Sequence, residues 1–210
     1  IVGVVVKTGL GLSLANSLIS LAGGSIMLTL FLVMIASLVL GMGAPTTANY
    51  VITSTIAAPA IITLLAPNTP MELVPLVTVM SAHFFVFYFG IIADITPPVA
   101  LAAFAASGIS GGDPIKTGVN SAKLAIAAFI IPYMIVLQPA LLMVDVTVIQ
   151  IIWVTFSAII GMIGIGAGII GYWYRKLMWF ERIILIGAGL AMIYPESISD
   201  IIGLVVFVIM

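Results

Sequence analysis

The feature that most constrains this chain is a series of long apolar runs without charged side chains. The longest of the apolar runs extends from Val146 to Tyr172 and contains no charged side chain. About 20 apolar residues are enough to cross the hydrocarbon core of a bilayer as a helix. Because no water is present there, each backbone N–H and C=O must find its partner within the protein, which favours helices. The sequence therefore predicts an all-α integral membrane protein.

The amino-acid composition also indicates a lipid environment. Hydrophobic residues make up 63% of the 210 residues and charged residues 6%, whereas an ordinary soluble domain has about 25% charged residues. Since so few charges cannot form a water-facing exterior, we expect the lipid bilayer to surround the chain. The net charge of -1 provides no basic surface, so no nucleic-acid partner is expected.

Several stretches are expected to form the helices of a polytopic bundle. They are Ile1–Ala22, Ser25–Met42, Leu73–Ile92, Leu124–Val144, Val146–Tyr172, Ile183–Tyr194 and the tail Ile198–Met210. The chain opens inside an apolar run without the basic region of a signal peptide, and we interpret it as part of a longer protein. We predict a transport core over 1–144 and a C-terminal transmembrane extension over 145–210.

Glycines crowd the span that follows Val146, and their spacing predicts close helix packing. Gly164 and Gly168 fit the small-xxx-small pattern, in which small side chains let two helices approach closely. Packing within the chain and packing between copies of the chain both fit this pattern.

The segment Gly41–Tyr50 breaks the apolar pattern. The residues in it that could bind an ion or a solute are Gly41, Gly43, Pro45, Thr46, Thr47 and Asn49. Glycine and proline end the preceding helix and free its carbonyl groups, and the hydroxyl and amide oxygens that follow suit an alkali cation. The N-terminus of the next helix would favour an anionic substrate. We expect a re-entrant hairpin over about 41–65, with a kinked helix whose threonines bond to their own backbone as the alternative.

A second break follows the span that begins near Leu73, so a discontinuous helix is expected over about 73–107. Its candidate binding residues are Thr96, Pro97, Pro98 and Val99, because consecutive prolines cannot lie inside an uninterrupted helix. Asp94 is an ionisable group in an apolar stretch and thus a candidate for coupling or substrate binding. A position at the water interface or at a helix cap is the alternative for Asp94.

His83 is the single histidine, and it lies within an expected span. A histidine there could relay protons or bind a substrate, or it could simply bond to a neighbouring helix. The chain has no cysteine and none of the common catalytic motifs. We therefore expect neither an enzyme nor an organic cofactor.

The motifs resemble those of one family, the large membrane subunit of the tripartite ATP-independent periplasmic (TRAP) transporters. More narrowly, the chain resembles the C-terminal part of the fused permeases that work with TAXI-type solute-binding proteins. The matching motifs are GMGAPTTA at 41–48, HFFVFYFG at 83–90, ITPPVALAA at 95–103, GDP at 112–114 and IYPESISDIIG at 193–203.

The resemblance implies one repeat of an inverted-repeat, elevator-type transporter in the inner membrane of a prokaryote. It further implies symport with sodium as the coupling ion, held in part by Thr46, Thr96 and the neighbouring backbone. The implied partners are an extracytoplasmic TAXI-type solute-binding protein, the N-terminal half of the same permease and a small organic anion. Two alternatives stay open: a proton-coupled carrier that uses Asp94 and His83, and a structural membrane subunit that transports nothing.

Overall fold

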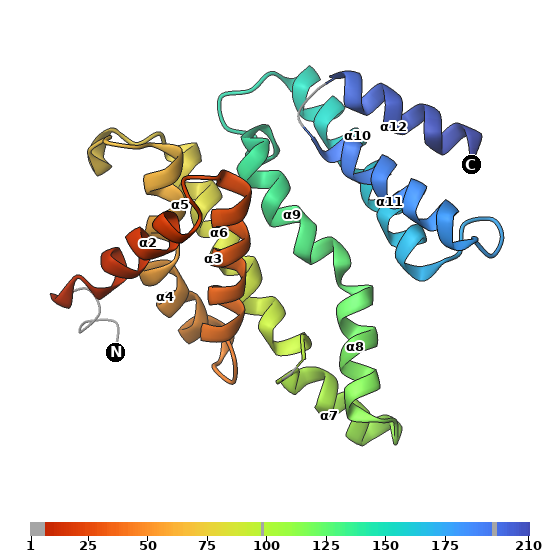
Figure 1. The fold of residues 1–210 in the computed structure, drawn as a ribbon, viewed down its shortest axis with the longest axis horizontal. Helices are drawn as coiled ribbons and strands as arrows, with labels where there is room; N and C mark the ends of the chain where they lie inside the picture. Colours follow the sequence, from red (N-terminus) through yellow and green to blue (C-terminus); the bar gives the residue numbers. More distant parts are fainter. Residues whose placement is uncertain (1–6, 98, 195–196) are drawn as a thin grey trace. The chain divides into compact units, whose positions relative to one another are not determined.

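The computed structural model describes residues 7–97, 99–194 and 197–210 and divides the chain into two compact units, Ile1–Val136 and Leu137–Met210. Helices dominate these ranges, and the β-type pairing among them is the isolated bridge between Tyr172 and Lys176. This confirms the all-α prediction. Figure 1 shows the course of the helices, and each unit is described separately below.

The first unit consists of helices joined by short loops. They are α2 (Leu10–Leu21), α3 (Ile26–Leu40), α4 (Thr46–Ile56), α5 (Ala58–Leu65), η1 (Met71–Leu73), α6 (Leu76–Ile92), η2 (Ala93–Ile95), α7 (Leu101–Ser110), α8 (Pro114–Leu124) and α9, whose last residue enters the second unit (Ile126–Leu137). The second unit contains η3 (Pro139–Leu142), α10 (Val148–Ile170), α11 (Trp179–Ile193) and α12 (Ser197–Ile209).

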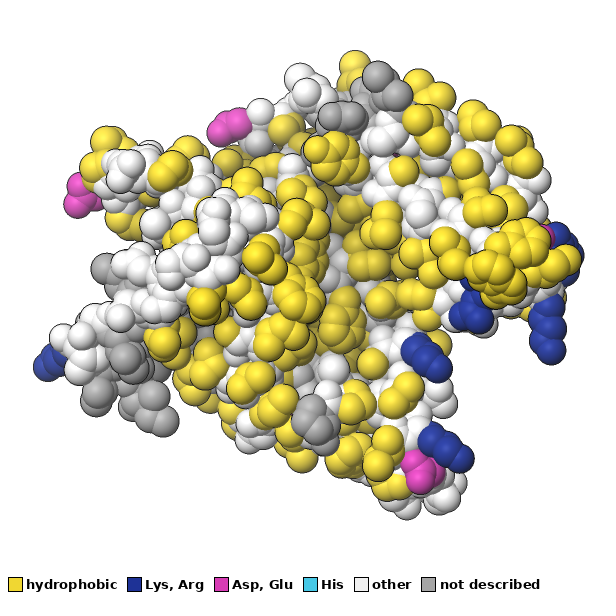
Figure 2. Space-filling model, viewed as in Figure 1, with side chains coloured by type: hydrophobic (Ala, Val, Ile, Leu, Met, Phe, Trp, Pro, Cys, Tyr) yellow, Lys and Arg dark blue, Asp and Glu magenta, His cyan; other side chains and the backbone are white. Residues whose placement is uncertain are grey.

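Four helical segments of the described ranges are long and apolar enough to cross a membrane. They are Thr46–Leu65, Leu76–Ile95, Pro114–Leu137 and Val148–Ile170. Apolar side chains are spread widely over the surface visible in Figure 2, as expected of a protein whose solvent is lipid. The chain is a polytopic membrane protein with discontinuous helices, as predicted.

The span expected at 124–144 is displaced in the structure and occupies Pro114–Leu137. Its start is determined by Asp113, whose Oδ1 accepts a hydrogen bond of 2.8 Å from the backbone N–H of Lys116, and by the proline at the first helical position. Lys116 and Lys123 therefore lie within α8 rather than ahead of the span.

The segment 41–65, expected as a re-entrant hairpin, is a short loop followed by two consecutive helices. Figure 1 shows α3 leading through this loop into α4, and α3 packs against both α4 and α5. Only Ala57 separates α4 from α5, and the two together are 20 residues long. The reversal of the chain thus lies at the start of the expected segment, and the remainder has the length of a full span.

The core of the first unit fixes α6 against α3 and α5. Phe85 and Phe89 are fully buried there together with Leu30 and Ile61. The ring of Phe85 stands edge-on to that of Tyr133, with 5.1 Å between the ring centroids, a favourable geometry for aromatic pairs. This packing holds the α6 backbone in place beside the two helix breaks.

The second unit is a helical hairpin, α10 and α11, with α12 packed against it. Gly171 ends α10 in the left-handed conformation, with φ of 82°, which glycine adopts without strain. Arg182 donates hydrogen bonds to the carbonyl oxygens of Gly168 (2.7 Å) and Ile169 (2.6 Å) and so satisfies the end of α10. Asp200 ties α12 to α10, because its Oδ2 accepts a 2.9 Å hydrogen bond from the indole N–H of Trp153.

We expect the stability of the second unit to fall in acid through Glu181, which lies outside the four spanning segments. Hydrogen bonds from Arg175 and from the backbone N–H of Met178 (2.8 Å) lower the pKa of Glu181 below its ordinary value of about 4.3. A lowered folded-state pKa stabilises above the ordinary pKa, and this contribution is lost as the pH falls through the folded-state value.

Thermal unfolding in detergent between pH 7 and pH 3 measures this effect. The melting temperature of the unaltered protein should fall more steeply below about pH 4.3 than that of Glu181→Gln, which has no carboxyl group to protonate. Parallel curves for the two proteins would contradict the assignment.

Candidate functional site

The two helix breaks meet where the end of α3 contacts η2. Gly41, the buried C-terminal cap of α3, lies so close to its neighbours that an added methyl group would be 2.8 Å from the Cβ of Ala93. The same methyl group would overlap the side-chain amide of Asn49. Only glycine permits this approach of α3, α4 and η2.

Asn49 lies at the centre of this contact and is fully buried. Its side-chain N–H donates to the backbone oxygen of Gly90 on α6, which joins α4 to α6. Its other polar atom, Oδ1, is buried and has no hydrogen-bond partner among the described residues. An acceptor oxygen therefore stays available between the helices.

Two further oxygens share this property. Ser37 Oγ on α3 and Asp94 Oδ1 on η2 are buried and also without a hydrogen-bond partner in the part of the chain that the structure describes. Ser37 precedes Gly41 by one helical turn and Asp94 follows Ala93, so all three oxygens belong to the elements that meet at Gly41. We call Ser37, Asn49 and Asp94 the oxygen cluster.

Such a cluster needs an explanation, because most buried polar atoms are hydrogen-bonded. Leaving a polar group unsatisfied in the interior costs about 1–3 kcal/mol, and more if it is charged. A carboxylate, an amide oxygen and a hydroxyl are the ligand types that hard cations prefer. These three oxygens therefore form a ligand set that fits a hard cation such as sodium.

The first break places its remaining candidates at the surface. Gly43 turns the chain with a φ of 76°, and Pro45 caps the N-terminus of α4 in an extended conformation. Thr46 and Thr47 occupy the first turn of α4 and are exposed in the first unit. Of the candidates at this break, Gly41 thus lies against η2 at the second break, and Asn49 lies against Gly41 and Gly90.

At the second break, Thr96 is half-buried and its hydroxyl donates a 2.7 Å hydrogen bond to the backbone oxygen of Ile92. The hydroxyl proton is used by the local backbone, while the lone pairs of Oγ1 can still accept a hydrogen bond or bind a cation. Pro97 and Val99 are half-buried. Pro98 lies outside the described residues.

His83 is hydrogen-bonded to a neighbouring helix, as one of its two interpretations expected. Its Nδ1 lies 3.0 Å from the hydroxyl of Tyr50 on α4. The two side chains line a pocket with Phe84 and Phe87. His83 thus belongs to the α4–α6 interface that also contains Asn49.

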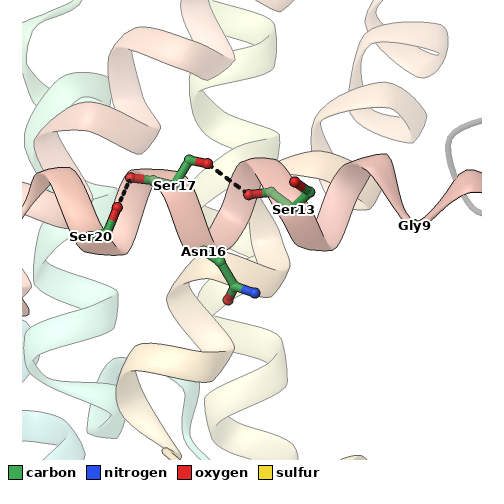
Figure 3. Close-up of a pocket in the computed structure, with 5 residues that line it drawn as sticks. All are labelled: Gly9, Ser13, Asn16, Ser17 and Ser20. Atoms are coloured by element: carbon green, nitrogen blue, oxygen red, sulfur yellow. Dashed lines mark hydrogen bonds between the residues drawn. The ribbon is translucent and has the colours of Figure 1, made fainter.

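A second polar feature runs along α2. The residues Gly9, Ser13, Asn16, Ser17 and Ser20 line a cavity of about 580 Å³ (Figure 3). Two of the hydroxyls bond to their own helix: Ser17 donates to the Ser13 carbonyl and Ser20 to the Ser17 carbonyl, each at 2.9 Å. Since these two protons are used locally, the face presents mainly the amide of Asn16 and the hydroxyl of Ser13.

Sequence reasoning missed Ser37 and Gly90. Ser37 is a polar residue in the apolar second half of α3, one turn before the break, and this position was an available signal. Gly90 contributes its backbone oxygen to Asn49. No residue type reveals such a contact, because every residue has a carbonyl.

These observations define a polytopic helical membrane protein in which the elements beside two helix interruptions carry buried oxygens without partners in the described ranges. Many transporters build their binding sites at interrupted helices. A family comparison is specific: residues 1–150 match the tripartite ATP-independent periplasmic transporter, DctM component. The chain belongs to this family, which is a family of transporter membrane components and not of enzymes, and the predicted resemblance to the large membrane subunit is confirmed. Residues 151–203 match a domain of unknown function (DUF3394). Neither the curated proteins nor the solved structures yielded a match.

Proposed function

We propose that the oxygen cluster binds the coupling sodium ion of a TRAP permease that imports small organic anions. The observation that carries the proposal is that three buried oxygens without hydrogen-bond partners among the described residues belong to the elements that meet at Gly41. One carboxylate and two neutral oxygens give a net charge of -1, which a monovalent cation neutralises. Symport follows if the ion and the solute stabilise the same arrangement of the breaks.

The remaining parts of the proposal concern the solute and its delivery. The exposed first turn of α4, with Thr46 and Thr47, presents the positive end of a helix dipole, which favours an anion. The family match supports delivery of the solute by an extracytoplasmic binding protein, here of the TAXI type. We further propose that the permease carries its solute by an elevator-type movement and lies in the inner membrane of a prokaryote. Sodium should stabilise the permease against thermal or chemical unfolding.

Direct sodium binding tests this function without knowledge of the solute. The whole permease in lipid nanodiscs should bind radioactive sodium, and sodium chloride should raise its melting temperature above that in choline chloride of equal ionic strength. Asp94→Asn removes the only charged ligand of the cluster. We expect it to weaken sodium binding by more than about tenfold, since even groups that merely support a ligand matter by 10–100-fold.

The matched control is Asp145→Asn, the same change at an exposed loop position with φ of 53°, which asparagine tolerates. This variant should bind sodium like the unaltered protein. Reconstituted vesicles then distinguish the coupling ions. Uptake driven by a proton gradient and indifferent to sodium, yet lost in Asp94→Asn, would replace this proposal with proton coupling through Asp94.

A further inference from the structure

A pocket of about 260 Å³ lies at the α4–α6 interface and is lined by Tyr50, His83, Phe84 and Phe87. Its walls are aromatic rings: Tyr50 stands edge-on to Phe87, with ring centroids 5.5 Å apart and an angle of 89° between the planes. Pockets for drug-sized ligands measure about 300–1,000 Å³. The pocket therefore suits a small molecule with an apolar body.

The polar groups of the pocket are the hydroxyl of Tyr50 and the imidazole of His83, 3.0 Å apart at Nδ1. A neutral tyrosine–histidine pair carries two polar hydrogens, and their mutual bond uses one of them. If Tyr50 donates, Nε2–H of His83 remains; if Nδ1–H donates, the Tyr50 O–H remains. In either tautomer the pair keeps one donor for an acceptor group on a ligand.

The position of this pair indicates that it does not face lipid. His83 lies within the spanning segment Leu76–Ile95, where ionisable side chains almost always face protein or a water-filled cavity. Tyr50 and His83 are each half-buried, so the pair can be reached from outside the first unit. A donor in such a place is suited to hold a polar group of a solute.

The pocket is close to the oxygen cluster along both of its helices. Tyr50 follows Asn49 directly, and His83 lies two helical turns before Gly90, which is bonded to Asn49. Two turns correspond to roughly 10 Å along the helix axis. The four lining residues include no cationic side chain, so the Asp94 carboxylate would repel a carboxylate bound in the pocket while the oxygen cluster is empty. A sodium ion in the oxygen cluster would neutralise Asp94 and remove this repulsion.

We propose that Tyr50 and His83 form the solute-recognition site and bind the carboxylate of a small monocarboxylate with an apolar or aromatic body. The aromatic rings contact the body on the pocket side, and the remaining N–H or O–H of the pair donates to the carboxylate. The sodium dependence of this binding rests on the proposed sodium site, whereas the pocket itself does not.

Phenylacetate is a suitable probe, with succinate and uncharged phenylacetamide as comparisons. Equilibrium dialysis on the whole permease in nanodiscs should show saturable binding of phenylacetate, tighter in sodium chloride than in choline chloride. Tyr50→Phe and His83→Phe should each weaken it by about tenfold or more, the effect expected for loss of a hydrogen bond to a charged group. Tyr88→Phe is the matched control on α6, outside the lining residues, and should bind phenylacetate normally.

Radioactive-sodium binding, measured on every variant, separates the two proposals and reports correct folding. If sodium binds but phenylacetate does not, the recognition site is refuted and the sodium site stands. Equal binding of phenylacetate and phenylacetamide would overturn the carboxylate preference. Phenylacetate binding that resists both pocket substitutions would place the solute elsewhere. Saturable binding that is lost with Tyr50→Phe but kept with Tyr88→Phe would support the site even if sodium had no effect.

Discussion

Gly41→Ala is expected to weaken sodium binding while the permease remains folded. The new methyl group would lie 2.8 Å from the Cβ of Ala93 and 3.0 Å from the backbone oxygen of Ser37, and it would overlap the amide nitrogen of Asn49. The Asn49 side chain would have to move, which breaks its bond to Gly90 and displaces its free oxygen. Overpacking of this kind costs about 1–3 kcal/mol, so we expect roughly 5- to 150-fold weaker binding, as about 1.4 kcal/mol corresponds to tenfold.

Two glycines of the same unit provide graded controls. A methyl group at Gly90 would lie 3.5 Å from the Asn49 side chain, which is an ordinary contact, and one at Gly108 would meet nothing within 4 Å. Alanine is favoured over glycine in a helix by about 1 kcal/mol, so neither control should destabilise the fold. Radioactive-sodium binding by the three alanine variants is the measurement. Gly41→Ala binding sodium as well as Gly90→Ala would mean that the ion is held elsewhere.

The membrane fold could be predicted from the sequence because short local segments determine it. A charge-free run such as Val146–Tyr172 has no stable alternative to a helix in lipid, and the prolines after Asp94 cannot continue one. Asp94 was a candidate because an ionisable group in an apolar stretch is functional by default, and Asn49 because its amide oxygen follows the break at Pro45. Position along the chain was sufficient for these inferences.

The geometry of the candidate site was not predictable, because it depends on contacts between distant segments. Gly41 marks the end of a helix in the sequence, but its closeness to Ala93 appears only when α3 and η2 are packed together. Thr46 and Thr47 have the right oxygens yet lie on the exposed side of α4. Glycine and proline indicated where the helix stops and could not indicate the direction in which the chain continued.

The glycines of the second unit illustrate the same distinction, since their spacing alone left open whether they pack within the chain. In the structure they do. A methyl group at Gly161 would lie 2.8 Å from the backbone oxygen of Gly189, and one at Gly168 would lie 2.9 Å from the backbone oxygen of Arg182. The backbones of α10 and α11 therefore touch, as small residues permit in membrane proteins.

Gly189→Ala should consequently destabilise the second unit by about 1–3 kcal/mol, the cost of overpacking. Its methyl group would lie 2.5 Å from the backbone oxygen of Gly161 and 2.6 Å from Cγ1 of Ile165, so the two helices would have to separate. Gly187→Ala is the matched control on the same helix: nothing lies within 4 Å of its methyl group, and alanine should stabilise the helix slightly.

Unfolding by titration with sodium dodecyl sulfate, followed by circular dichroism, measures both variants, and size-exclusion chromatography reports their oligomeric state. The expected result is a lower midpoint for Gly189→Ala than for the unaltered protein, an equal or higher midpoint for Gly187→Ala, and no change in elution volume. If Gly189→Ala instead shifted the protein to a smaller assembly without a change in midpoint, the glycines would join copies of the chain rather than α10 and α11.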